Sequence, residues 1–238
     1  MRIAIFENIM TPGGHEVDFD RILVDELKKL GHEVVLYVPE GFRFGMDYHV
    51  PVEYLPGAPV LYTNARGLRK MLLSVQRERR RFGWYRALSE AAERGAFDAL
   101  IVPTSTYRYL RALKKSVLRQ STVPVYFIFL GVNPKEMPKF LKAARSCLSW
   151  RSIRLCVTTL RDDFGEHRPD NVRLIAPPVM APPMPRAEKE GDVLRIGFFG
   201  HYRKGEKKLA WFLRAAEEGR FARPVEFVLQ AAPTTAED

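Results

Sequence analysis

The most constraining feature of this sequence is a pattern of strand, glycine turn and helix that occurs twice. MRIAIFENIMTPGGHEV begins the first copy, and LRIGFFGHYRKGEKK, from Leu194, begins the second. A buried strand that ends at glycine and leads into a helix presents backbone N–H groups and a helix dipole to a phosphate-bearing ligand. Two copies predict two facing α/β domains. Only one helical stretch and one strand, PVEFVLQ, follow the second copy, so we expect the second domain to be incomplete.

Apolar stretches rich in β-branched residues and bounded by turn residues predict the strands of the first domain. These strands span residues 2–6, 33–38, 48–55, 97–102, 123–130, 153–160 and 171–176. Helical patterns separate most of them, at residues 18–30, 64–81, 85–94, 107–118 and 134–148. This alternation predicts a Rossmann-like, doubly wound and mostly parallel sheet.

A proline-rich and then charged stretch separates the two copies of the pattern. Such a composition is typical of an exposed linker. We therefore expect a first domain at residues 1–177, a linker at 178–192 and the start of a second domain at 193–238.

Composition narrows the setting of the protein. No apolar run approaches the roughly 20 residues that a membrane-spanning helix needs, and the amino terminus lacks the pattern of a signal peptide. We expect a cytoplasmic protein, with peripheral attachment to the inner face of the membrane as a further expectation. The two cysteines, Cys147 and Cys156, show no metal-binding spacing, and we interpret both as small buried apolar residues.

The formal net charge of +10 is concentrated between Arg66 and Arg86, where basic residues alternate with apolar and aromatic ones. A basic helix of this kind favours contact with anionic lipid. A solvated helix face above an ordinary buried stripe explains the same pattern. Nucleic acid is a third interpretation, but no recognition motif supports it, so we expect no nucleic-acid partner.

Ligands of parallel α/β sheets bind outside the carboxyl ends of the strands, so the loops after strands are the candidate sites. In the first such loop, Gly13 and Gly14 allow close approach of a ligand, and His15 and Glu16 can hydrogen-bond or transfer a proton. The alternative is a turn that needs glycine for its geometry alone.

Later loops add polar side chains. Thr104, Ser105 and Arg108 suit a polyhydroxylated or phosphorylated ligand, although Thr104 or Ser105 could equally cap the next helix. Asn133 has the same two interpretations.

The loop after the strand of the second copy is strongly basic. Gly200, His201, Arg203 and Lys207 lie at a glycine turn before a helix, an arrangement that predicts binding of a diphosphate, with a solvated basic loop as the alternative. The adjacent acids Asp162 and Asp163 lack a third ligand, so no metal is expected.

With these segments in order, the sequence resembles the GT-B fold glycosyltransferases, especially the retaining branch called family 4. The resemblance rests on the opening strand and glycine loop, on FDALIVPTSTYR, on NVRLIAPPVM before the linker, and on LRIGFFGHYRKGEKKLAWFLRA. His201 stands where the family usually has arginine, with Arg203 as its substitute, and Lys207 corresponds to the family's lysine. The family's Glu-x7-Glu region lies beyond Asp238.

The resemblance implies transfer of a sugar from a nucleotide-sugar to an acceptor in a cleft between two domains, without a metal or other cofactor. His15 would then be the catalytic residue, and the basic helix would hold the protein at a membrane that carries a lipid-linked acceptor. The alternative is a non-catalytic binding or accessory protein of the same fold, which agrees with Leu130 where many relatives have histidine. Another kind of nucleotide-binding protein is disfavoured, since no G-x-G-x-x-G or Walker fingerprint is present.

Overall fold

The computed structural model describes residues 1–9, 15–60, 65–159, 162, 164–177, 192–202 and 207–233. The chain divides into two compact units, Met1–Met180 and Ala181–Asp238.

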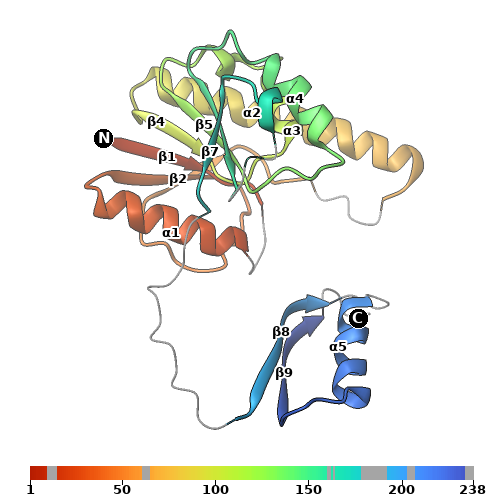
Figure 1. Cartoon of the computed structure of the whole chain (residues 1–238). Coiled ribbons are helices and arrows are strands. Elements are labelled where there is room, and N and C mark those ends of the chain that lie inside the picture. The colour runs from red at the N-terminus through yellow and green to blue at the C-terminus, as the bar shows by residue number, and fades with distance from the viewer. Residues whose placement is uncertain are drawn as a thin grey trace. The chain divides into compact units, whose positions relative to one another are not determined.

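The first unit contains one seven-stranded sheet in which all neighbouring strands are parallel (Figure 1). Its strands are β1 (Arg2–Phe6), β2 (Glu33–Pro39), β3 (Val52–Leu55), β4 (Ala99–Val102), β5 (Val125–Phe129), β6 (Ile153–Thr158) and β7 (Val172–Ile175). They lie in the order β3-β2-β1-β4-β5-β6-β7. This arrangement confirms the Rossmann-like α/β fold that the alternation of strands and helices predicted.

Helices cover both faces of this sheet. They are α1 (His15–Lys29), α2 (Gly67–Glu93), α3 (Tyr107–Leu113) and α4 (Met137–Arg145), with short 3-10 turns η1 (Val117–Gln120) and η2 (Gly165–His167). Figure 1 shows α1 on one side of the sheet and α2, α3 and α4 on the other. Because side chains alternate along a strand, Ile5 packs towards Val24 of α1, whereas Phe6 packs towards Trp84 and Tyr85 of α2.

Helix α2 differs from the sequence prediction. We expected two helices, at residues 64–81 and 85–94, and the structure has one continuous helix from Gly67 to Glu93. Glycine inside a helix costs about 1 kcal/mol relative to alanine. Gly83 is exposed, and the helix buries Trp84, Tyr85 and Leu88 immediately after it. Burial of each such side chain contributes about 1.5–3 kcal/mol, so tertiary packing outweighs the local preference of glycine.

Both cysteines are buried, as the sequence predicted. Cys147 follows α4 and is 1% exposed, and Cys156 lies in β6 and is 8% exposed. Burial raises the pKa of the Cys147 thiol to about 11 and also raises that of Cys156. Both therefore remain protonated thiols near neutral pH.

The second unit contains β8 (Leu194–Tyr202), α5 (Lys207–Glu218) and β9 (Val225–Pro233). The two strands are parallel, with Leu194 opposite Val225. Phe212 of α5 packs between Phe198 and Phe227, with ring centroids 5.5 and 5.4 Å away. The unit is thus a single βαβ motif, in which Trp211 and Leu229 remain exposed.

No helix in the described part of the chain is long and apolar enough to cross a bilayer.

Candidate functional site

The order of the strands places the candidate site between β1 and β4. The connection from β1 leads through α1 to β2 on one side of β1, whereas β4 lies on its other side. In sheets of this kind the ligand crevice lies at the carboxyl ends of the two strands where the order reverses. The loops that follow β1 and β4 therefore define this switch point.

A buried carboxylate joins the two loops. Glu7 follows β1 and is 4% exposed. Its Oε1 accepts hydrogen bonds from the backbone N–H groups of Asn8 at 2.6 Å and Ile9 at 2.5 Å. Its Oε2 accepts one from the Thr104 hydroxyl, which follows β4, at 2.9 Å. Hydrogen bonds to an ionised acceptor are among the stronger ones in proteins, so Glu7 fixes both loops in one arrangement.

A second connection reaches the switch point from α3 and α2. The Tyr109 hydroxyl of α3 donates to Asn8 Oδ1 at 2.7 Å. The Arg81 guanidinium of α2 lies 4.3 Å from the centre of the Tyr109 ring and binds Glu78 at 2.8 Å. Burial raises the pKa of Tyr109, although the Arg81 charge opposes that shift. The phenol therefore stays protonated and keeps its role as a hydrogen-bond donor to the β1 loop.

Acidic groups lie on the α1 side of the same region. Tyr48 donates a hydrogen bond to the Val17 carbonyl at 3.4 Å. Burial raises the pKa of Tyr48, and the nearby carboxylates of Asp20 and Glu7 add to the shift. Asp20 itself is 4% exposed. Two buried carboxylates thus approach the switch point, one from the sheet and one from the first turns of α1.

The predicted residues after β4 and β5 have identifiable contacts. Thr104 donates to Glu7, and the Ser105 hydroxyl donates to the Val102 carbonyl at 3.1 Å. Neither caps α3, whose N-cap is Thr106. Arg108 is exposed, and its guanidinium lies 6.0 Å from the centre of the Tyr107 ring. Asn133 Oδ1 accepts from the Lys135 N–H at 2.9 Å, which orders the turn before α4.

The other predicted residues lie at or outside the limits of the described residues. Gly13, Gly14 and Arg203 are outside them, as is Asp163. His15 and Glu16 form the first turn of α1, Gly200 and His201 lie near the end of β8, and Lys207 begins α5; their backbone positions are described, but their side chains are not. Their proposed roles remain predictions.

Sequence reasoning missed four residues of this site, namely Glu7, Asn8, Arg81 and Tyr109. Glu7 carried a signal that could have been used, because an acidic residue directly after the apolar run RIAIF lies at the carboxyl end of a strand. Arg81 carried none, because it stands among other arginines and only the fold shows that its side chain is 6% exposed.

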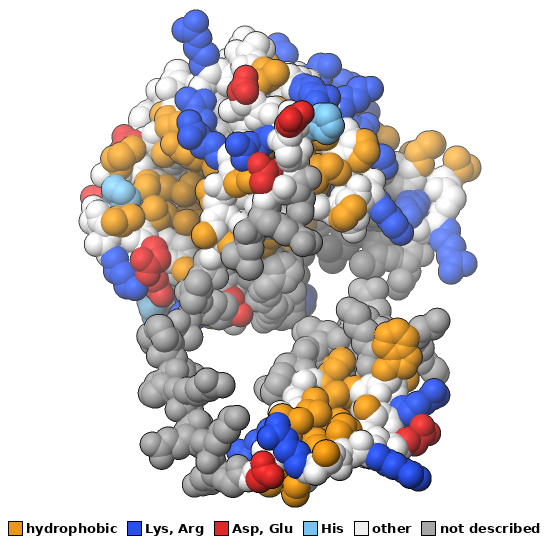
Figure 2. Space-filling model, viewed as in Figure 1, with side chains coloured by type: hydrophobic (Ala, Val, Ile, Leu, Met, Phe, Trp, Pro, Cys, Tyr) orange, Lys and Arg blue, Asp and Glu red, His pale blue; other side chains and the backbone are white. Residues whose placement is uncertain are grey.

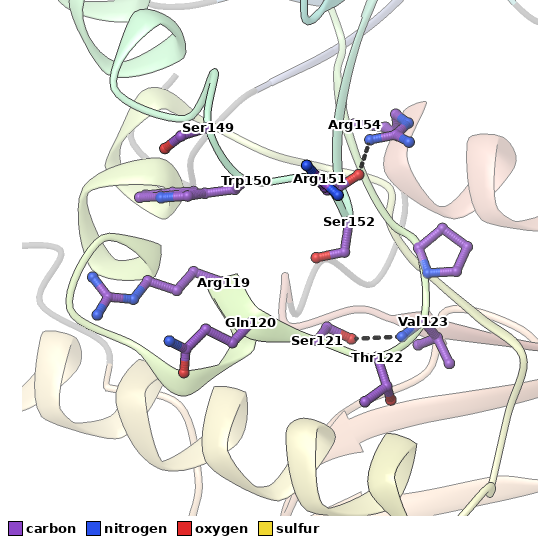
Figure 3. A pocket seen from close by; sticks show the side chains of 11 residues that line it. Arg119, Gln120, Ser121, Thr122, Val123, Ser149, Trp150, Arg151, Ser152 and Arg154 are labelled. Atoms are coloured by element: carbon purple, nitrogen blue, oxygen red, sulfur yellow. Dashed lines mark hydrogen bonds between the residues drawn. The ribbon is translucent and has the colours of Figure 1, made fainter.

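A cavity of about 750 Å³ lies at the other end of the strands, near the amino ends of β5 and β6. It is lined by the segments that precede β5 and β6, at residues 119–124 and 149–152, and by Arg154 near the start of β6. Figure 3 shows the Trp150 ring on one side of it and Arg119 and Gln120 on another. Because these residues are at the amino ends of the strands, this cavity is separate from the switch point.

No group of three or more His, Cys, Asp or Glu side chains is arranged to hold a metal ion among the described residues. Asp162 instead accepts from the backbone N–H groups of Phe164 and Gly165 at 2.9 and 3.2 Å and binds Arg168 at 3.1 Å.

Comparison with known proteins gives a match in structure but not in sequence. No model of a protein family matches the chain, and no curated protein does. The glycosyltransferase of kitacinnamycin is similar, with a TM-score of 0.53, 15% identity, and coverage of 96% of this chain and 65% of that one. CalG4, the calicheamicin glycosyltransferase, has a TM-score of 0.55 and 15% identity, and the match covers 97% of this chain and 66% of that one. Anabaena Alr3699/HepE in complex with UDP and glucose has a TM-score of 0.51 and 13% identity, and the match covers 98% of this chain and 62% of that one.

These similarities show that the chain has the fold of these enzymes, the GT-B fold. The chain spans about two thirds of the length of the structures that it matches.

Proposed function

We propose that this chain is the acceptor-side domain, with the beginning of the donor-side domain, of a glycosyltransferase that uses a nucleotide-sugar. The observation that carries the proposal is the pair of loops joined by Glu7 and Thr104 at the switch point, in a chain that shares its fold with glycosyltransferases. One of those, HepE, is a complex with UDP and glucose. Loops joined by hydrogen bonds at this position suit the binding of a polar, hydroxyl-rich substrate.

The roles of individual residues follow from their place in the fold. His15 begins α1, directly after Gly13 and Gly14 in the sequence, and is the proposed catalytic residue. Arg203 and Lys207, after β8, would offset the charge that develops on a departing diphosphate. We propose that the transfer needs no metal, because these basic groups supply the positive charge that a metal supplies elsewhere.

Activity is tested on the longest natural form of the protein, by measuring release of nucleoside diphosphate from a panel of nucleotide-sugars in the presence of acceptors. His15→Ala should lower turnover by about 10²- to 10⁴-fold, the range of general acid–base catalysis. His32→Ala, just beyond the other end of α1, is the matched control and should leave turnover unchanged. Equal turnover of His15→Ala and the parent protein would reject the catalytic role of His15, and absence of acceptor-dependent release with every donor would reject the function.

The surface of α2 supports attachment to a membrane. Several large apolar side chains in its amino-terminal half are exposed to solvent, namely Leu68, Met71, Leu72 and Val75. Figure 1 shows this end of α2 projecting from the rest of the unit, and Figure 2 shows hydrophobic and basic side chains together on it. Apolar residues among basic ones are the pattern of helices that bind the surface of anionic membranes.

We propose that the segment 66–86 binds the inner face of the membrane, where a lipid-linked acceptor would be available, through the exposed side chains of its amino-terminal part. Arg81, Trp84 and Tyr85, near its other end, are buried and do not take part. The protein should sediment with vesicles that contain phosphatidylglycerol, and binding should weaken as salt is raised from 50 to 300 mM. Equal binding to neutral phosphatidylcholine vesicles would contradict the proposal.

A further inference from the structure

A groove lies between the amino-terminal half of α2 and the helix α3, with a volume of about 730 Å³. Basic side chains from both elements line it: Lys70 and Arg77 from α2, Arg108 and Arg111 from α3, and Lys115 from the turn after α3. Two separate elements thus direct positive charge to one hollow.

The lining of the groove carries more positive than negative charge. Among the described residues that line the groove, Glu78 is the one carboxylate, and it is bound at 2.8 Å to Arg81, which lies outside the lining. Like charges that converge on a hollow repel one another, and an anion placed there relieves the repulsion. The groove is therefore electrostatically complementary to a multiply charged anion such as a phosphate group.

The groove also has apolar walls that continue onto the projecting helix. Met71, Phe82 and Tyr107 line it together with the basic residues. Met71 belongs both to the groove and to the exposed apolar set of α2, where Leu72 is 65% exposed. A ligand with a phosphate in the groove can therefore lay an apolar chain against α2 without leaving the protein surface.

The position of the groove connects it with the switch point. Tyr107 and Arg108 line the groove and lie three and four residues after Thr104, which binds Glu7. Arg81, which holds Glu78 of the groove, stacks on Tyr109, whose hydroxyl binds Asn8. The same helices therefore line the groove and order the loops of the candidate site.

We propose that this groove binds the phosphate group of an amphiphile, a lipid phosphate whose apolar chain lies along the exposed face of α2. The identification of that lipid as the sugar acceptor rests on the function proposed above, whereas the binding itself does not. Lipid binding is measured without a sugar donor and without turnover. The protein can therefore transfer sugar without binding the lipid in the groove, or bind the lipid without transferring sugar, and the experiments distinguish failure of one proposal from failure of the other.

The test is calorimetric titration of the full chain with dihexanoyl phosphatidic acid below its micelle concentration. The double variant Arg111→Gln/Lys115→Gln removes two exposed charges from the groove. The control, Arg79→Gln/Lys114→Gln, removes the same number of exposed charges from outside the groove, one from α2 and one from the turn after α3. We expect the groove variant to bind about tenfold more weakly and the control to bind within about twofold of the parent.

Two further ligands separate the parts of the proposal. Dihexanoyl phosphatidylcholine, which has no net charge, and glycerol 3-phosphate, which has no apolar chain, should each bind at least about tenfold more weakly than the phosphatidic acid. Equal binding of the phosphatidylcholine would show that charge is not recognised, and equal binding of glycerol 3-phosphate would show that the chain is not. Equal weakening by the two double variants would show that net charge, and not the groove, attracts the lipid. Any of these results overturns the proposal.

Discussion

Replacing Glu7 should unlock both loops of the switch point. Its carboxylate accepts two backbone hydrogen bonds and one from Thr104, at 2.5 to 2.9 Å. Each hydrogen bond to a charged acceptor contributes about 1.5–3 kcal/mol, and three that share one carboxylate give less than their sum. We expect Glu7→Ala to lower the free energy of unfolding of the first unit by about 3–5 kcal/mol, and Thr104→Val to lower it by about 1–2 kcal/mol.

Urea unfolding followed by tryptophan fluorescence measures this effect. Trp84 is 3% exposed, and its ring lies 5.9 Å from that of Phe6, the residue before Glu7. All proteins in the series should carry Trp211→Phe, so that the signal comes from the first unit and not from α5. Glu53→Gln, an exposed carboxylate on β3, is the control and should change the free energy of unfolding by less than about 0.5 kcal/mol.

A double-mutant cycle isolates the contact between the two loops. Glu7→Ala and Thr104→Val should be coupled by about 1 kcal/mol, because each change removes one side of the same hydrogen bond. The reasoning is refuted if the two changes are additive, or if Glu7→Ala costs no more than Glu53→Gln.

Three further predictions concern residues away from the switch point's Glu7. Arg81→Ala should lower the free energy of unfolding by about 2–4 kcal/mol, since it removes the contacts with Tyr109 and Glu78; exposed Arg79→Ala should change it by less than about 0.5 kcal/mol in the same urea assay, and equal effects would contradict this. Gly83→Ala should raise it by about 0.5–1 kcal/mol, because a Cβ there meets nothing within 4 Å; a lower melting temperature by circular dichroism would be inconsistent with a continuous α2. Burial raises the pKa of Cys147 from 9.0 to about 11, so the folded state holds that proton more tightly, and the thiol's contribution to stability is full below pH 9 and lost as pH rises towards 11. The free energy of unfolding, measured with urea between pH 8 and 11, should decline less steeply with pH for Cys147→Ala than for the parent. Identical slopes would show that the Cys147 thiol does not contribute to this pH dependence.

The sheet could be predicted from the sequence because strands buried on both faces are continuous apolar runs. The prediction of two separate helices around Gly83 was wrong. A rule based on local sequence takes account of the glycine but not of the buried face that Trp84, Tyr85 and Leu88 form. The helix boundary that we expected there depends on contacts with a sheet assembled from distant segments.

The site was predictable only in part. Thr104 was predicted as a ligand-binding residue because polar residues after a strand lie at the carboxyl ends of the strands, and that role stays a prediction. Its hydrogen bond to Glu7 was not predicted, because Glu7 is 97 residues away in the sequence. Periodicity describes neighbours within one element and gives no information on such pairs. Arg81 was likewise counted with the surface charge of its helix, although the structure buries it against Tyr109.

The bond between Glu7 and Thr104 also bears on how this protein can change over generations. A substitution that removes the carboxylate of Glu7 leaves the Thr104 hydroxyl without this acceptor. A substitution that removes the Thr104 hydroxyl leaves one carboxylate oxygen of Glu7 without this donor, although the two residues are 97 positions apart in the sequence. Either single step costs stability, and the second step recovers part of it. Positions 7 and 104 are therefore expected to be inherited as a pair, with substitutions at one accompanied by substitutions at the other.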